Sequence, residues 1–242
     1  MIDFFPTREV ALVVGYFSLH WYAILYLVAF AQGWWLLPRL QIHRNLSLAG
    51  EQNLDVLTWA VAGVLIGGRL GYVLLYEPLY YVQHPLEVFF LSQGGMSFHG
   101  GLIGVGVALW LASRNAQIEY LRLLDIVVIP AALGLALGRA GNWINQELFV
   151  STAAHVLVIG KDLTLAILTY FVLKRWRQPG SVVVVFLLGY AALRFISEFW
   201  RVHEVAGFGG LSRGQLLCLP MFAVGIVLVC RVIKATRVAD HP

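Results

Sequence analysis

Long apolar stretches separated by short polar segments run along the whole chain. Each stretch is close to about 20 residues, the length that a helix needs to cross the hydrocarbon core of a bilayer. The pattern predicts about seven transmembrane helices, at roughly 19–38, 56–76, 97–113, 123–140, 155–173, 181–200 and 214–233. We therefore expect an all-α, polytopic helical membrane protein, with a single integral membrane domain over residues 1–242.

Two parts of the pattern depart from simple spans. The segment at about 77–95 is aromatic and amphipathic but too short to cross, which is typical of an interfacial segment lying along the membrane surface. In the fifth span, Lys161 and Asp162 interrupt the apolar run. The loop from about 146 to 156 is short, and we expect it to form at most a reduced head outside the membrane.

Composition narrows the class of protein. Of the 242 residues, 60% are hydrophobic and only 12% are charged, whereas about a quarter of the residues in a typical soluble domain are charged. The formal net charge is +4, but the basic residues lie mostly at predicted helix ends. The expected partner is therefore the membrane, and no nucleic acid is expected.

The basic residues also predict the orientation of the chain. Ten lie in segments on one side of the membrane and four on the other. The larger group consists of Arg39, Arg44, Arg114, Arg122, Lys174, Arg175, Arg177, Arg231, Lys234 and Arg237, and the smaller group of Arg8, Lys161, Arg201 and Arg213. Because cytoplasmic loops carry the excess of Lys and Arg, we expect the N-terminus outside and the C-terminus in the cytoplasm.

Four polar clusters lie against the apolar background. They are His20–Tyr22, Gly94–Gly104, Gly138–Glu147 and Arg194–Arg201, and the predicted orientation places all four at the outer ends of their spans. Hydrocarbon offers polar groups no hydrogen bonds, and each unsatisfied group costs several kcal/mol. The shared location therefore indicates one site, which we expect to hold a lipid with a polar head.

The cluster near the end of the sixth apolar run has the chemistry of an anion site. Arg194, Glu198 and Arg201 are spaced by four and three residues, so they share one face of a helix. The planar fork of arginine donates two parallel hydrogen bonds to phosphate, and Glu198 can orient one arginine while the other faces a ligand. A salt bridge that only ties helices together explains the same triplet equally well.

The other clusters each allow two interpretations. His99, flanked by glycines, can act as a general base or only donate a hydrogen bond, and the Gly100–Gly104 spacing is also a helix-packing device. Asn142 and Asn145 can cap a helix end; with Arg139 and Glu147 they can also bind the hydroxyls of a glycerol head. Arg69 is either a further phosphate contact or a packing arginine.

Five motifs, in the same order along the chain, resemble those of the prolipoprotein diacylglyceryl transferases. They are Gly67–Leu74, Met96–Gly104, Gly138–Leu148, Arg194–Arg201 and Gly214–Met221, and the similarity extends from about 18 to 234. The resemblance implies a multi-pass enzyme of the bacterial cytoplasmic (inner) membrane, with its active site toward the outer leaflet. Such an enzyme moves the diacylglyceryl group of phosphatidylglycerol to the lipobox cysteine thiol in the signal peptide of a prolipoprotein. It releases glycerol phosphate and needs no cofactor and no metal.

The resemblance also implies roles for individual residues. The expected catalytic residues are His99, Arg139 and Arg194: the two arginines would hold the phosphate, and His99 or a carboxylate would help to deprotonate the thiol, since the thiolate is the nucleophile. The residues expected to bind substrate are Tyr22, Arg69, Asn142, Asn145, Glu147, Glu198 and Arg201.

The chain departs from the family pattern after the third motif. Val150 stands where the family has a glycine, and Ala153–Asp162 replaces a head segment and a further motif. The missing head bears on peptide recognition more than on lipid binding. One alternative is therefore a related lipid transferase with another acceptor. Another is a lipid or solute transporter, which is disfavoured because the charges gather at one face and no matching halves are visible.

Overall fold

The computed structural model describes residues 2–4, 8–90, 94–149, 151–201 and 209–240. The chain divides into two compact units, one formed by Met1–Asn45 with Leu124–Pro242 and the other by Leu46–Leu123.

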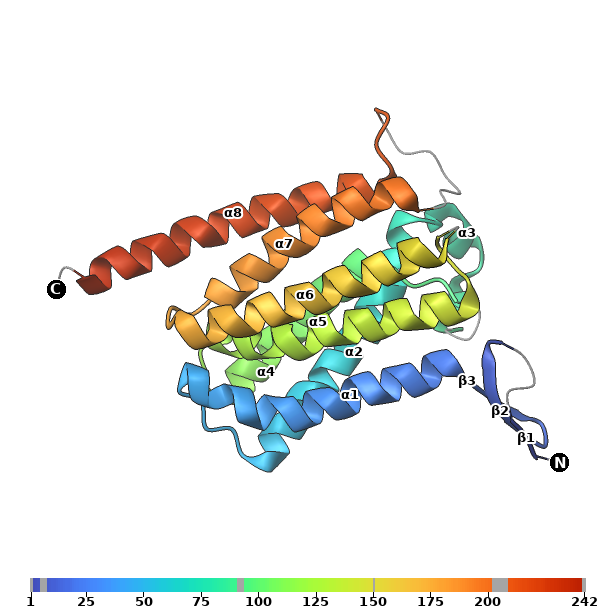
Figure 1. Cartoon of the computed structure of the whole chain (residues 1–242), viewed down its shortest axis with the longest axis horizontal. Helices are drawn as coiled ribbons and strands as arrows, with labels where there is room; N and C mark the ends of the chain where they lie inside the picture. Colours follow the sequence, from blue (N-terminus) through green and yellow to red (C-terminus); the bar gives the residue numbers. More distant parts are fainter. Residues whose placement is uncertain (1, 5–7, 91–93, 150, 202–208, 241–242) are drawn as a thin grey trace. The chain divides into compact units, whose positions relative to one another are not determined.

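The first unit is built from five long helices. They are α1 (Trp21–Leu40, continued by the 3-10 helix η1, Gln41–Arg44), α5 (Tyr120–Asn145, which begins in the second unit), α6 (Thr152–Arg175), α7 (Ser181–Ser197, continued by η4, Glu198–Trp200) and α8 (Arg213–Asp240). Helix α7 packs against both α6 and α8 (Figure 1). The large buried side chains include Leu37, Ile126, Leu165 and Tyr190, so α1, α5, α6 and α7 each carry residues of the buried interior.

A small antiparallel sheet precedes α1 and was not predicted. Its strands are β1 (Ile2–Phe4), β2 (Val10–Val14) and β3 (Phe17–His20), with β2 in the centre. Gly15 and Tyr16 form the turn between β2 and β3, and Gly15 has a φ of 61°. A two-residue turn with a glycine at positive φ matches the twist of paired strands. This sheet adds to the expected helical fold.

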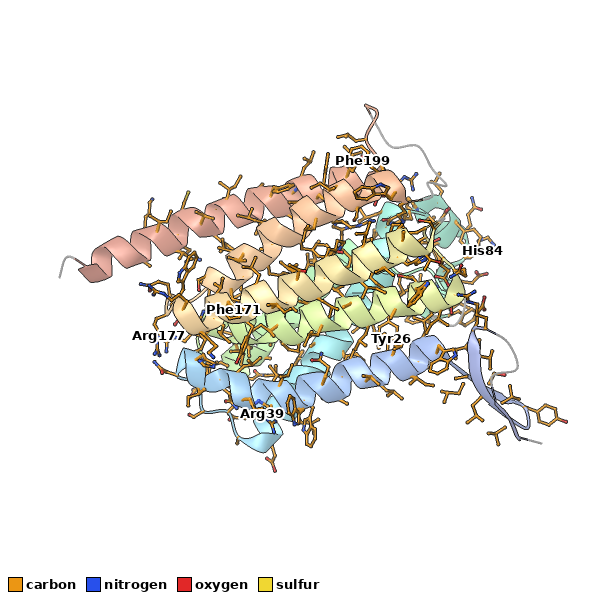
Figure 2. The ribbon with its side chains drawn as sticks, in the orientation of Figure 1. Tyr26, Arg39, His84, Phe171, Arg177 and Phe199 are labelled. Atoms are coloured by element: carbon orange, nitrogen blue, oxygen red, sulfur yellow. The ribbon has the colours of Figure 1, made fainter. Side chains whose placement is uncertain are left out.

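One end of the first unit is held by a buried ion pair. Asp125 accepts a hydrogen bond from Arg44 Nε at 2.7 Å and further bonds from the backbone N–H groups of Gly180, Val182 and Val183. The carboxylate thereby satisfies the free donors at the start of α7. Arg44, which the sequence analysis counted among the loop cations, is buried here. Figure 2 shows Arg39 and Arg177 near the same end of the unit.

The second unit centres on two helices that meet through glycine. They are α2 (Gly50–Leu75) and α4 (Phe98–Asn115), joined by α3 (Pro78–Gln83) and η2 (Pro85–Phe89). A Cβ atom on Gly67 would lie 2.5 Å from the carbonyl oxygen of Gly100, and one on Gly104 would lie 2.2 Å from that of Gly63. Only glycine allows the two backbones to approach so closely.

The expected interfacial segment at 77–95 contains α3 and η2, while residues 91–93 lie outside the described residues. Its large apolar side chains are exposed, namely Leu79, Val82, Leu86 and Phe89. Tyr80 donates a hydrogen bond to Glu87 at 2.7 Å, which ties α3 to η2.

Among the described residues, six helical stretches are long and apolar enough to cross a membrane: Trp21–Arg44, Gly50–Leu75, Tyr120–Asn145, Thr152–Arg175, Ser181–Trp200 and Arg213–Ala235. The chain is therefore a multi-pass helical membrane protein, as expected. The span predicted at 97–113 coincides with α4, an 18-residue helix outside this group of six. The count of about seven spans, and their orientation, remain predictions.

Candidate functional site

The end of α5 carries a network of polar side chains. Asn142 donates hydrogen bonds to the hydroxyl of Tyr22 and, at 3.4 Å, to Glu147 Oε2. Tyr22 donates to the same carboxylate oxygen at 3.3 Å, and Asn145 donates to the other at 2.9 Å. Arg139 donates to Asn142 Oδ1 at 3.3 Å. Five residues that the sequence analysis singled out therefore form one connected group.

The local backbone explains why this group forms. Helix α5 ends at Asn145, and the next residue, Gln146, has a φ of 57° in the left-handed region. The chain then turns back, so that the N–H of Glu147 bonds to the carbonyl of Asn142 at 2.9 Å. A Cβ atom on Gly141 would lie 2.9 Å from the ring of Tyr22. Glycine at this position therefore lets Tyr22 lie directly against α5.

The second predicted cluster lies where α7 ends. Glu198 forms an ion pair with Arg194 and a longer one, at 3.9 Å, with Arg201. Ser212 also donates a hydrogen bond to Glu198 at 3.0 Å. A Cβ atom on Gly214 would lie 2.7 Å from Glu198 Oε1, so glycine at the start of α8 makes room for the carboxylate. The contacts expected from the spacing are present, but Arg201 follows the last turn of η4 in an extended conformation, so the three residues do not share one helical face.

Three residues that the sequence analysis did not include lie beside both clusters. Asp162, wholly buried on α6, faces Arg139 across 3.7 Å and pairs with Lys161 at 2.5 Å. The Lys161 ammonium lies 5.3 Å from the centre of the Tyr190 ring. Both Arg139 and Arg194 lie within electrostatic range of Lys161 and Tyr190. Lys161, Asp162 and Tyr190 thus connect the arginine of α5 with that of α7.

Two of these three residues, Lys161 and Asp162, could have been recognised as candidate site residues from the sequence. The charges of Lys161 and Asp162 interrupt an apolar run, and charged residues inside a membrane segment mark functional positions. On sequence alone the two residues mark a break in the fifth span, Lys161 also counts among the outer basic residues, and neither was expected to belong to the site. Tyr190, in contrast, lies in a continuous apolar run with no local signal.

The expected head at about 146–156 is short in the structure. Val150 lies outside the described residues. Ser151 caps α6, and Phe149 forms an isolated β-bridge with Arg201. The ring of the buried His155 contacts the carbonyl oxygens of Ser151 and Glu147, at 3.0 and 2.9 Å. This link fastens the start of α6 to the turn that carries Glu147.

Arg69 belongs to the second unit and is almost wholly surrounded by backbone. Its guanidinium donates hydrogen bonds to five carbonyl oxygens, those of Glu87, Val88, Phe90, Gly94 and Gly95. Arginine has five N–H donors, so these carbonyls account for its donor capacity. Of the two interpretations given to Arg69, these contacts favour packing.

His99 lies in the second unit, at the first turn of α4. Ser97 caps this helix by accepting a hydrogen bond from Gly100 N at 3.2 Å, and its own N–H donates to Gly68 O at 2.8 Å. These contacts, together with the edge-to-face contact of its ring with Phe98, fix His99 on α2 and α4. Its chemical role stays a prediction.

A small groove lies beside the α5 network. It is lined by Tyr22, Leu25, Tyr26 and Ala29 from α1 and by Gly134 and Gly138 from α5. Figure 2 shows Tyr26 projecting from α1. The lining is mostly apolar, and Gly134 and Gly138 present no side chains to it.

Comparison with known proteins gives one consistent result. Residues 9–231 match the sequence profile described as prolipoprotein diacylglyceryl transferase. A protein from Verminephrobacter eiseniae is 40% identical, with 96% of this chain and 95% of the relative covered. One from Bordetella avium is 40% identical over the full length of both chains. One from Nitratidesulfovibrio vulgaris is 39% identical, with 92% of each covered. All three are named phosphatidylglycerol–prolipoprotein diacylglyceryl transferase.

Proposed function

The chain belongs to the prolipoprotein diacylglyceryl transferase family, and from this premise we propose that it transfers the diacylglyceryl group of phosphatidylglycerol to the lipobox cysteine thiol of a prolipoprotein. The observation that carries the proposal is the connected group of buried cations in the first unit. Arg139 and Arg194, from different helices, both lie within electrostatic range of the same two side chains, Lys161 and Tyr190.

The proposed reaction is a substitution at carbon. The cysteine thiolate attacks the glyceryl carbon that bears the phosphate oxygen, so that a C–S bond forms as the C–O bond breaks. The electron pair of that bond leaves with the oxygen as glycerol phosphate, and the thiol proton goes to a base. Negative charge accumulates on the leaving phosphate, which fixed cations in a water-poor site stabilise.

Arg139 and Arg194 are the proposed phosphate ligands. Arginine stays charged when it is buried and presents several donors to phosphate oxygens. Glu198, which pairs with Arg194 and Arg201, orients these side chains. The network of Tyr22, Asn142, Asn145 and Glu147 offers both donors and acceptors, as the hydroxyls of a glycerol head require.

For the second unit we retain His99 as the proposed base for the thiol, because an imidazole titrates near neutral pH. Arg69 has a different proposed part. Its bonds to five carbonyls hold the segment that leads into Ser97 and His99, so it supports the substrate site by fixing the backbone.

The proposed location is the bacterial inner membrane, with one integral domain, the reacting groups toward the outer leaflet and residues 77–95 along its surface. The basic end of the first unit, with Arg44 and Arg177, would then face the cytoplasm. In a variant without the native cysteines, an impermeant thiol reagent should label Tyr16→Cys and spare Arg177→Cys in intact cells. The reverse labelling would contradict this orientation.

The shorter chain bears on recognition of the acceptor more than on lipid binding. The alignment with the Bordetella avium protein is 267 residues long against the 242 residues of this chain, so that relative contains stretches absent here. The short turn between α5 and α6 agrees with a reduced head. A lipobox peptide is therefore the substrate to test first.

The direct test uses purified protein in vesicles that contain phosphatidylglycerol. We expect glycerol phosphate to appear only when a lipobox peptide is added, together with a peptide whose mass has increased by one diacylglyceryl group. The control peptide carries serine in place of the cysteine. Release with both peptides, or modification of neither, would contradict the proposed function.

A further inference from the structure

Lys161 and Asp162 place two charges in the middle of a membrane helix. Both side chains turn toward the interior of the first unit, where that of Asp162 has no exposed surface and that of Lys161 is 10% exposed. Burying a charge is costly unless it is paired. The proposed phosphate site as expected from the sequence does not use either residue.

The contacts of Asp162 point to Arg139. One carboxylate oxygen, Oδ1, lies 2.5 Å from Lys161 Nζ, and the other, Oδ2, lies 3.7 Å from Arg139 Nε. Within the described part of the chain, both Asp162 Oδ2 and Arg139 Nε are buried and lack a hydrogen-bond partner. A buried carboxylate oxygen therefore faces a buried arginine N–H across 3.7 Å, with Tyr190 also within reach of Arg139.

The charges show what kind of contribution the pair makes. The charged side chains of the network comprise the cations Arg139, Lys161, Arg194 and Arg201 and the carboxylates Glu147, Asp162 and Glu198. This is one positive charge in excess, which suits the single negative charge of a phosphodiester. Lys161 and Asp162 together are neutral, so removing both leaves the excess unchanged. The pair therefore contributes by orienting a neighbouring group and not by changing the net charge of the site.

We propose that Asp162 is a positioning residue for the phosphate ligand Arg139. Asn142 holds Nη1 of the guanidinium and Asp162 faces Nε, so the plane of the group is fixed on two sides. Lys161 pairs with the other carboxylate oxygen of Asp162 at 2.5 Å, and this contact holds the carboxylate beside Arg139. A misplacement of about 1 Å can lower a rate about 100-fold, which makes such support valuable. This inference rests on the proposed function of the site.

The test compares Asp162→Asn in the wild-type background and in an Arg139→Gln background. Thr169→Val is the matched control, because Thr169 is also a buried polar residue of α6 but bonds only to carbonyls of its own helix, those of Leu165 and Ala166. Two quantities are measured: the affinity for phosphatidylglycerol, from titration of a fluorescent analogue, and peptide-dependent release of glycerol phosphate.

We expect Asp162→Asn to lower both quantities at least about tenfold in the wild-type background. In the Arg139→Gln background it should change the affinity less than twofold, and Thr169→Val should change neither quantity. An equal loss in both backgrounds, no loss in either, or an equal loss in Thr169→Val would overturn the proposal. If the lipid affinity depends on Asp162 as expected but the wild-type protein releases no glycerol phosphate, the proposed function is contradicted and this inference stands.

Discussion

At the scale of single residues, Glu198 shows how a buried carboxylate can serve a cationic site. It forms ion pairs with Arg194 and Arg201 and accepts a hydrogen bond from the hydroxyl of Ser212. Its carboxylate lies against Gly214 at the start of α8. With one carboxylate between two arginines, one positive charge remains uncompensated. We interpret Glu198 as the residue that orients the arginines, while the arginines carry the phosphate contact.

This interpretation predicts unequal effects at neighbouring positions. Arg194→Gln should lower transfer at least about 100-fold, the size typical for loss of a group that stabilises developing negative charge. Glu198→Gln keeps the shape of the side chain and should cost less, because Arg194 retains its charge. Arg177→Gln, at the other end of the unit, is the control. Initial rates of glycerol phosphate release measure all three, and a loss in Glu198→Gln equal to that in Arg194→Gln would show that the carboxylate itself takes part in the chemistry.

The sequence predicts contacts between residues that are close along the chain, but not contacts between different helices. Spacing along the chain was enough to expect the contacts of Glu198 with Arg194 and Arg201, because the three residues are close in sequence around the end of α7. The contacts of Asp162 with Arg139 and of Arg44 with Asp125 join different helices, and spacing along the chain carries no information about them. Tyr190 was missed for the same reason.

At the scale of elements, α2 and α4 depend on backbone approach. Gly63, Gly67 and Gly71 follow one face of α2 and meet Gly100 and Gly104 on α4. In a bilayer, close packing takes over much of the role that the hydrophobic effect has in water. The same helices carry Arg69 and His99, so this contact positions both.

Two glycine-to-alanine substitutions on α4 should change the stability of the protein in opposite directions if this contact is present. Gly104→Ala would place a Cβ 2.2 Å from the carbonyl oxygen of Gly63 and should destabilise the protein by about 1–3 kcal/mol. Gly106→Ala meets only Tyr120 Oη at 3.6 Å and should be neutral or stabilising, because alanine favours a helix by up to about 1 kcal/mol. Thermal unfolding in detergent measures both variants. A Gly104→Ala protein as stable as wild type would show that the two backbones do not meet in this way.

The elements themselves were largely predictable. Apolar runs long enough to cross a bilayer as helices predict the long helices. The observed helix ends differ from the expected ones by several residues. The N-terminal sheet was missed because its strands are short and the Gly15–Tyr16 turn is the main local signal. The interfacial segment contains two short helices, α3 and η2, and not one, because Pro85 starts a new helical turn after His84.

At the scale of the whole molecule, sequence and structure supply different parts of the account. The ordered motifs indicated the family, which the comparisons show, and hence the reaction to be tested. The structure supplies the connection between motifs within the first unit, through Lys161, Asp162 and Tyr190. That connection turns two separate arginine motifs into one proposed anion site.

The most direct test of this claim is the lipid preference of the purified protein. Native mass spectrometry would compare the binding of phosphatidylglycerol with that of uncharged diacylglycerol, in wild type, in Arg139→Gln/Arg194→Gln and in the control Arg177→Gln. We predict that wild type and the control prefer phosphatidylglycerol and that the double variant loses this preference at least about tenfold, because each charged hydrogen bond contributes about 1.5–3 kcal/mol. A double variant that keeps the full preference would contradict the account.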